Sequence, residues 1–299
     1  MRHIPQFPDS RAVELGDKPF LDELFAAMRP EISAYTFTNL FSWREPHAVG
    51  LSRVGERLIA HYNDGPKRVC LQPLGAGPAK PTIEEAIRVS GTEVEFAYLH
   101  SDAASEFDGD PAFATGPDRD NSDYLYLASD LIELAGRKFD AKRNFISRFK
   151  SQWQYEYVRI TPNTAQECHE FAQQWCVERR CDTVEGLKRE KCAVYQMLAN
   201  FEALGLVGGA IKVDGAVVAF SIGEALNPET MVVHVEKADA RFDGIYQVIS
   251  NEFSIHEAAG FTYINREQDL GVPGLRKAKE SYHPVRLVET WRVAANSQS

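Results

Sequence analysis

A glycine turn in the last third of the chain has the features of a phosphate site. Residues 240–244 (ARFDG) follow the β-branched run at 231–237 and precede a segment of helical periodicity at 245–259. Such a turn presents free backbone N–H groups and the positive end of a helix dipole, which together suit a phosphate or pyrophosphate. The residues expected to bind that group are Arg241, Gly244, Ile245, Tyr246 and Gln247.

Ionisable side chains surround this turn in the sequence. Glu236 ends the strand, where its carboxylate can act as a base in a cleft or can pair with a cation such as Lys237, and both readings stay open. His234 lies between two valines of the same strand, a position more typical of a buried, hydrogen-bonded histidine than of a catalytic one.

A second group of polar residues follows the strand expected at 261–264. Its carboxylate and amide groups can bind an acceptor amine, or they can lie in a solvated loop. Two cations, Arg276 and Lys279, are three residues apart on the helix expected at 274–282 and can contact phosphate. These candidate substrate residues are Asn265, Glu267, Asp269, Arg276 and Lys279.

Residues 137–153 (RKFDAKRNFISRFKSQW) predict a basic helix. Phe139, Ile146 and Phe149 recur at helical spacing, which leaves the cations on the other faces. One interpretation is a solvated charged face on a helix between two domains, and the other is a phosphate grip by Lys142 and Arg143.

The elements predicted along the chain repeat once. The first half reads as helices, a hairpin at 48–62, a strand at 68–73, a helix at 82–89 and a strand at 94–99. The second half reads as a strand, two helices, a hairpin around Asp214-Gly215, the strand and helices described above, and a closing strand at 288–293. Residues 101–123 are acidic and turn-rich, so we expect a mobile surface connection outside the core. The pattern predicts an α/β (α+β) protein with domains at 1–135 and 136–299.

Composition excludes several classes of function. No window resembles a membrane span, and the N-terminus lacks the apolar core of a signal peptide, so a cytoplasmic protein is expected. The five cysteines form no C-x-x-C pair and read as ordinary thiols, with no metal site. The net charge of -10 repels polyanions except at a local basic patch. Hydrolase, nucleotidase and metalloprotease motifs are absent.

The order of elements resembles the GNAT acyltransferase fold. In that superfamily the corresponding turn carries Q/R-x-x-G-x-G/A, of which Arg241 and Gly244 match while Tyr246 replaces the last small residue. The runs RKFDAKRNFISRF, HVEKA and NREQDLGVPGLRKAKESYHP resemble the phosphatidylglycerol lysyltransferase C-terminal-domain family. That resemblance implies two tandem GNAT-like domains with mixed sheets flanked by helices, the first of them degenerate, as in the related Fem aminoacyltransferases.

The resemblance also implies a reaction. An acyl or aminoacyl group would pass from acyl-CoA or aminoacyl-tRNA to an amine or hydroxyl of a small molecule or lipid headgroup. Tyr282 lies where many GNAT enzymes place the acid for the leaving group, and Glu236 is the candidate base. The alternative is a non-catalytic module that binds a small ligand or a partner on a GNAT-like scaffold.

Overall fold

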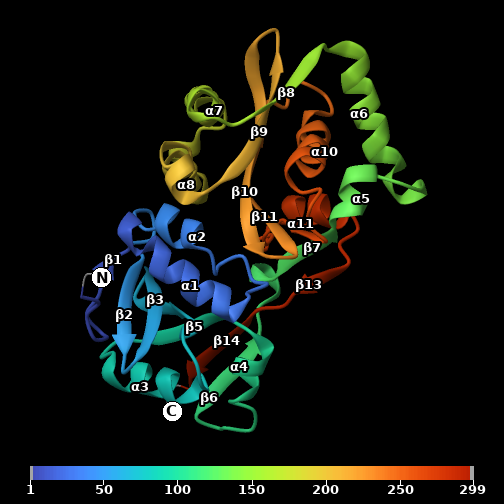
Figure 1. The fold of residues 1–299 in the computed structure, drawn as a ribbon. Helices are drawn as coiled ribbons and strands as arrows, with labels where there is room; N and C mark the ends of the chain where they lie inside the picture. The colour runs from blue at the N-terminus through green and yellow to red at the C-terminus, as the bar shows by residue number, and fades with distance from the viewer. Residues whose placement is uncertain (1–2, 297–299) are drawn as a thin grey trace. The chain divides into compact units, whose positions relative to one another are not determined.

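The computed structural model describes residues 3–296, and these form two α/β units with separate hydrophobic cores (Figure 1). The first unit contains the chain up to Asp123, Gln268–Gly271 and the segment that begins at Val288. The second contains Tyr124–Glu267 and Val272–Leu287. The chain therefore leaves each unit and returns to it.

The first unit is built on a mixed sheet of seven strands in the order β1-β2-β3-β4-β5-β14-β6. Only β4 and β5 pair in parallel. The strands are β1 (Arg11–Ala12), β2 (Gly50–Val54), β3 (Arg57–Asp64), β4 (Lys67–Leu71), β5 (Val94–Leu99), β6 (Phe113–Pro117) and β14 (Trp291–Ala295). The helices are η1 (Leu15–Asp17), α1 (Lys18–Met28), α2 (Phe37–Ser42), α3 (Lys80–Val89), α4 (Ser101–Ser105) and η2 (Arg119–Asn121).

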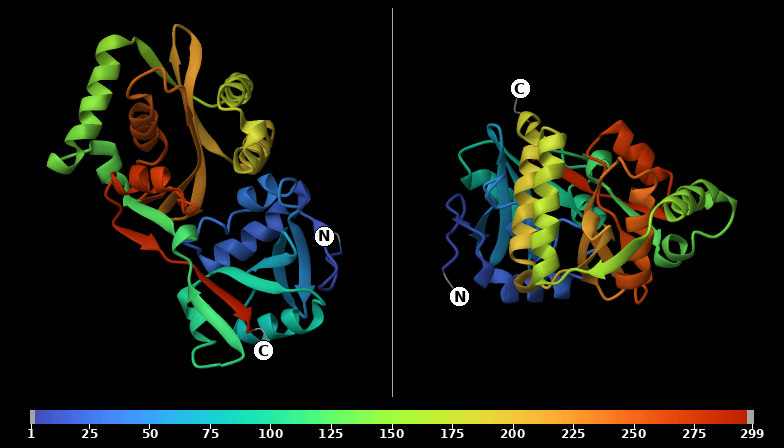
Figure 2. Two further views of the ribbon diagram at one scale, coloured as in Figure 1. Left: turned by 180° about the vertical axis from the view of Figure 1, so that it is seen from behind. Right: turned by 90° about the horizontal axis from the view of Figure 1, so that it is seen from above.

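The second unit has its own seven-stranded mixed sheet, in the order β13-β7-β12-β11-β10-β9-β8. Its strands are β7 (Asp123–Leu127), β8 (Tyr155–Arg159), β9 (Val207–Val213), β10 (Ala216–Asn227), β11 (Thr230–Ala238), β12 (Tyr263–Asn265) and β13 (Arg286–Val288). Its helices are α5 (Ala128–Glu133), η3 (Arg137–Phe139), α6 (Asp140–Gln152), α7 (Pro162–Glu178), η4 (Cys181–Thr183), α8 (Glu185–Ala199), α9 (Phe201–Leu204), α10 (Ile245–Glu257) and α11 (Pro273–Glu280). Helices α7 and α8 lie side by side (Figure 2).

The core of the second unit follows from the apolar pattern of β11 and α10. Val232 is fully buried in β11, and Val248, Ile249 and Phe253 recur at helical spacing on the buried face of α10. Helix α10 also packs against the basic helix α6. The helix that was expected at the junction of two domains is thus part of one unit, with Ile146 and Phe149 in its core.

The segment 101–123 was expected to be a mobile connection, and this was wrong. It contains α4 and β6, and Phe107 is buried in the core of the first unit. Strand β6 pairs antiparallel with β14, from Pro117 opposite Trp291 to Phe113 opposite Ala295. Strand β14, about 175 residues further along the chain, therefore orders β6, although the local composition of that segment is typical of turns.

The two units also differ from the predicted domains at both ends. Residues 124–135, predicted to close the first domain, lie in the second unit, where β7 pairs with β12. The closing strand predicted for the second domain is β14, which joins β5 and β6 in the first sheet, as the red strand in Figure 1 shows. The first sheet therefore takes β14 from the predicted second domain, and the second sheet takes β7 from the predicted first domain.

Candidate active site in the second unit

A cluster of ionisable residues occupies the point where β11 and β12 stop pairing. The parallel ladder between them ends at Val232 opposite Asn265. Beyond it, Nη2 of Arg266 lies 3.1 Å from each carboxylate oxygen of Glu236. Since no backbone bonds join the two strands here, the side chains bridge the opening.

Arg266 carries an unsatisfied donor at this opening. Its side chain is 14% exposed. Burial opposes the charge, but Glu236 and the nearby tyrosines keep the pKa of the guanidinium above its usual range. Its Nη1 is buried and has no hydrogen-bond partner among the described residues. Buried polar groups of this kind are rare in folded proteins, and one reason for them is a ligand that completes the bond.

Tyr282 lies against the same guanidinium. Its ring centroid is 4.8 Å from the guanidinium carbon of Arg266, and its hydroxyl interacts with the side chains of Arg266 and Ser250. Burial raises the pKa of the phenol to about 12. Tyr282 is thus a neutral proton donor at physiological pH.

Lys142 of α6 completes this group. Its Nζ lies 3.8 Å from the ring centroid of Tyr282 and donates to Oγ of Ser281 at 2.6 Å. Burial, and next the charge of Arg266, lower the pKa of the amine to about 8, against the opposing effect of Glu236. The sequence predicted Lys142 as a phosphate contact, and the structure brings it to the candidate catalytic residues.

Arg143, predicted beside Lys142 as a phosphate contact, has a different environment. It donates to the carbonyl of Leu134, to the carbonyl of Gly136 at 2.8 Å and to the carboxylate of Asp140. These bonds fasten the start of α6 to the preceding turn.

The glycine turn has a close packing requirement. Gly244 has φ +88°, and a Cβ at this position would lie 2.4 Å from the carbonyl oxygen of Phe145 in α6. The amide of Ile245 donates to the carbonyl of Phe242 at 3.1 Å, and that of Gln247 to the carbonyl of Gly244 at 3.0 Å. The turn therefore brings α6 and α10 together, and its role as a phosphate site stays a prediction.

The remaining residues of the turn lie as follows. The side chain of Arg241 pairs with Asp239 at 2.6 Å and is largely exposed. Tyr246, which stands at the last position of the turn motif, is half-buried, and its side chain interacts with that of Trp175.

Two of the predicted acceptor residues gather around His234. The imidazole Nδ1 lies 2.8 Å from Oε1 of Glu267, and Nε2 lies 2.9 Å from Oε1 of Glu224. Burial opposes a charge on this ring, but the bonds to Glu224 and Glu267 raise its pKa to about 10, so it is an imidazolium between two carboxylates. Asn265 is buried beneath them, and its side-chain oxygen accepts from the amide of Glu267 at 2.7 Å.

The other predicted substrate residues are dispersed. Asp269 belongs to the first unit, where it is buried and pairs with Arg119 at 3.1 Å. Lys279 donates to the carbonyl of Arg266, and Arg276 is half-buried on α11. The sequence analysis did not single out Arg266, Ser250 or Ser281, although Arg266 lies inside the quoted run NREQD.

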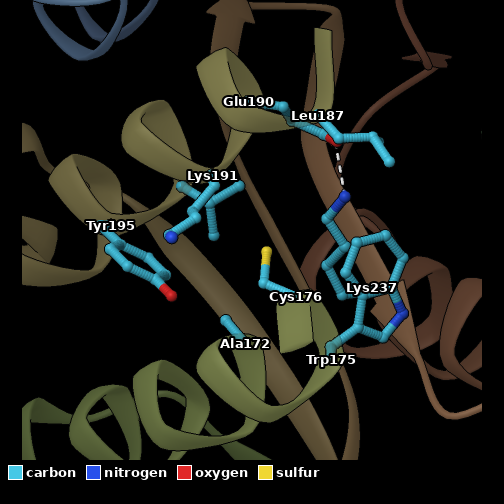
Figure 3. Close-up of a pocket in the computed structure, with 9 residues that line it drawn as sticks. Ala172, Trp175, Cys176, Leu187, Glu190, Lys191, Tyr195 and Lys237 are labelled. Atoms are coloured by element: carbon cyan, nitrogen blue, oxygen red, sulfur yellow. Dashed lines mark hydrogen bonds and ion pairs between the residues drawn. The ribbon is translucent and has the colours of Figure 1, made fainter. Parts of the chain in front are cut away.

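A separate small pocket lies between α7, α8 and β11 (Figure 3). There Lys237 pairs with Glu190 at 2.6 Å, with its Nζ 4.2 Å from the ring centroid of Trp175. The pocket volume of about 10 Å³ is at the lower limit for one water molecule. We therefore locate the candidate chemistry at the Arg266 cluster.

Comparison with solved structures defines the class of protein. A conserved protein of unknown function from Bacteroides thetaiotaomicron is 36% identical, with a TM-score of 0.88 over 96% of this chain and 99% of its own. The L-PGS structure from Bacillus licheniformis is 14% identical, with a TM-score of 0.65 over 100% and 95%. A tandem GNAT protein from the clavulanic acid biosynthesis pathway is 12% identical, with a TM-score of 0.51 over 97% and 98%. The fold is two tandem GNAT-like domains with mixed sheets flanked by helices.

The family follows from the sequence profile. The profile described as phosphatidylglycerol lysyltransferase, C-terminal, matches residues 25–294, so the chain belongs to this family. Family and fold together point to a GNAT-like acyl or aminoacyl transferase. An uncharacterized protein from Mycoplasmoides gallisepticum is 22% identical over 184 residues, which are 58% of this chain and 56% of that protein. The match thus spans little more than half of that relative. Within residues 3–296, no helix is long and apolar enough to cross a membrane.

Proposed function

We propose that the second unit transfers an acyl or aminoacyl group from an activated donor to an amine or hydroxyl acceptor at the Arg266 cluster. The observation that carries this proposal is the unpartnered Nη1 of Arg266 beside the neutral hydroxyl of Tyr282. Acyl transfer needs a donor for the oxyanion that forms on the carbonyl and an acid for the leaving group. Arg266 and Tyr282 supply this pair of functions.

Each residue has a role in this scheme. The carbonyl oxygen of the donor accepts from Nη1 of Arg266, which stabilises the tetrahedral oxyanion. Tyr282 protonates the leaving oxygen or sulfur. Glu236 was predicted either as a base or as the partner of a cation. Because both of its oxygens lie 3.1 Å from Nη2 of Arg266, we propose that it positions the guanidinium.

The donor and the acceptor follow from the family and the fold. We propose that the donor is acyl-CoA or aminoacyl-tRNA, with its phosphates at the turn from Arg241 to Gln247 and attracted by Lys142 and Arg143. The family description supports an aminoacyl donor and a lipid-headgroup acceptor, whereas the tandem GNAT neighbour supports a CoA thioester. Asn265, Glu267 and Arg276 are proposed to contact the acceptor.

A paired screen tests this function. Thermal stability is measured with acyl-CoA thioesters and, separately, with aminoacyl-tRNA, and products with amine and lipid-headgroup acceptors are sought by mass spectrometry. A ligand that binds only the native state raises its apparent stability by mass action. Stabilisation with product supports the transferase. Stabilisation without product favours the non-catalytic binding module, and no response to either donor overturns the proposal.

A further inference from the structure

We propose that Lys142 is a catalytic residue of this site, and that its Nζ accepts the proton of the attacking acceptor. This inference rests on the proposed function and deepens it, because it assigns the base that Glu236 does not supply.

Lys142 differs in its partners from five other lysines of the second unit. Its Nζ donates to a serine hydroxyl and lies over an aromatic ring, and within the described residues no carboxylate lies within 4.0 Å of it. Five other lysines of this unit each pair with a carboxylate, namely Lys138, Lys150, Lys191, Lys212 and Lys237. Lys142 therefore lacks the counter-charge that would hold it permanently protonated.

The groups that face the amine also disfavour its charge. Arg266 also lies over the Tyr282 ring, so two cations share one aromatic ring. Ser281 contributes a neutral hydroxyl, and the carboxylate that acts on the amine, Glu236, is engaged by Arg266. With a pKa of about 8, part of the Lys142 population carries a free lone pair near neutral pH. A base is most effective when its pKa is close to the working pH.

The proton balance of the reaction can be written with these residues. The acceptor N–H or O–H gives its proton to Nζ of Lys142 as its lone pair forms the bond to the donor carbonyl carbon, and the carbonyl π electrons move to the oxygen that faces Arg266. Collapse of the intermediate breaks the bond from this carbon to the leaving oxygen or sulfur, which takes the proton of the Tyr282 hydroxyl. The ammonium of Lys142, beside the Tyr282 ring, returns a proton to the tyrosinate through water. Both residues end as they began.

The decisive variant is Lys142→Arg, which keeps the positive charge and removes the base. We expect turnover to fall by about 100-fold or more, with donor affinity close to the wild-type value. The wild-type kcat should rise with pH up to about 8, and this rising limb of the pH profile should be absent in the variant. Lys150→Arg is the matched control, since Lys150 lies on the same helix and pairs with Glu252. Wild-type turnover and an unchanged pH limb in Lys142→Arg would overturn the inference.

A second measurement does not depend on turnover. Competitive labelling with acetic anhydride, followed by mass spectrometry, reports the fraction of neutral amine at each lysine as a function of pH. A midpoint near pH 8 at Lys142 supports the inference, whereas a midpoint near 10.5 or above overturns it. If the wild-type protein forms no product with any donor, the proposed function is wrong, and so is the assignment of Lys142 as its base. If the wild-type protein forms product and Lys142→Arg turns over at the same rate, the assignment of Lys142 as the base is wrong while the proposed function stands.

Discussion

The guanidinium of Arg266 and the carboxylate of Glu236 meet where the backbone ladder between β11 and β12 has ended. Both carboxylate oxygens lie 3.1 Å from the same nitrogen, Nη2. The ion pair therefore joins two strands that no longer bond to each other, while the buried Nη1 has no hydrogen-bond partner among the described residues. Stability and the proposed chemistry thus depend on the same arginine.

Replacement of Glu236 by Gln should destabilise the protein. Both partners are largely buried, and the neutral amide leaves the Arg266 charge without a counter-ion, which costs about 3 kcal/mol in the free energy of unfolding. Urea unfolding followed by circular dichroism measures this loss. Glu185→Gln, which removes the exposed pair with Arg189, is the control and should change stability by less than about 1 kcal/mol. Equal effects of the two substitutions would show that the buried pair contributes no more than a surface pair.

Tyr282→Phe should lower turnover while donor affinity stays nearly unchanged. The substitution removes the hydroxyl that we propose as the acid for the leaving group and keeps the ring that packs against Lys142 and Arg266, so kcat should fall by about 100-fold or more. Single-turnover kinetics at saturating donor and acceptor measure this change. Tyr263→Phe on β12 serves as the control. Turnover at the wild-type rate would exclude Tyr282 as the acid.

His234 predicts a loss of stability at alkaline pH. Its folded-state pKa of about 10 is above the ordinary value of 6.5, so the stabilisation is fully present below about pH 6.5 and is lost as pH rises through 10. Lys142 has a lowered pKa, so its contribution to the free energy of unfolding rises with pH between about 8 and 10.5, which is the opposite slope. The informative quantity is therefore the difference in unfolding free energy between wild type and His234→Gln. That difference in unfolding free energy should shrink from pH 6.5 to pH 10. A difference independent of pH would show that His234 is neutral in the folded protein.

Gly244→Ala should destabilise the second unit. The new Cβ would lie 2.4 Å from the Phe145 carbonyl in a backbone with φ +88°, a conformation that costs alanine of the order of 1 kcal/mol even without the contact. We expect a loss of about 2 kcal/mol or more in thermal unfolding experiments. Gly260→Ala is the matched control, because its Cβ would meet no atom within 4 Å. Equal melting temperatures for the two variants would contradict this packing.

Much of the second unit could be predicted because its signals are local. The β-branched run of β11, the helical spacing of α10 and the Asp214-Gly215 turn each specify their own element, and the structure confirms them. Strand β6 has the sequence FATGP, which carries no such signal, and it forms because β14 supplies its hydrogen bonds. Pairing between distant segments leaves little trace in either sequence.

The site shows the same division. The sequence singled out Glu236, Tyr282 and Lys142 separately, by position and by family resemblance, but their proximity depends on how β11, the turn after α11 and α6 pack in three dimensions. Arg266 was missed because an arginine in a polar loop looks solvated in the sequence. Its burial and its unpartnered nitrogen arise from the end of the β12 ladder, which only the structure defines.

The place of β14 in the first sheet has a consequence for biosynthesis. Its residues, Trp291–Ala295, are translated after the whole of the second unit, yet they separate β5 from β6, which are translated before that unit. The nascent first unit must therefore wait with two unpaired strand edges while the second unit is translated, and exposed edges of this kind favour aggregation. Its sheet can be completed only after the second unit has been translated, so a chaperone that shields β5 and β6 during synthesis should raise the yield of the native protein.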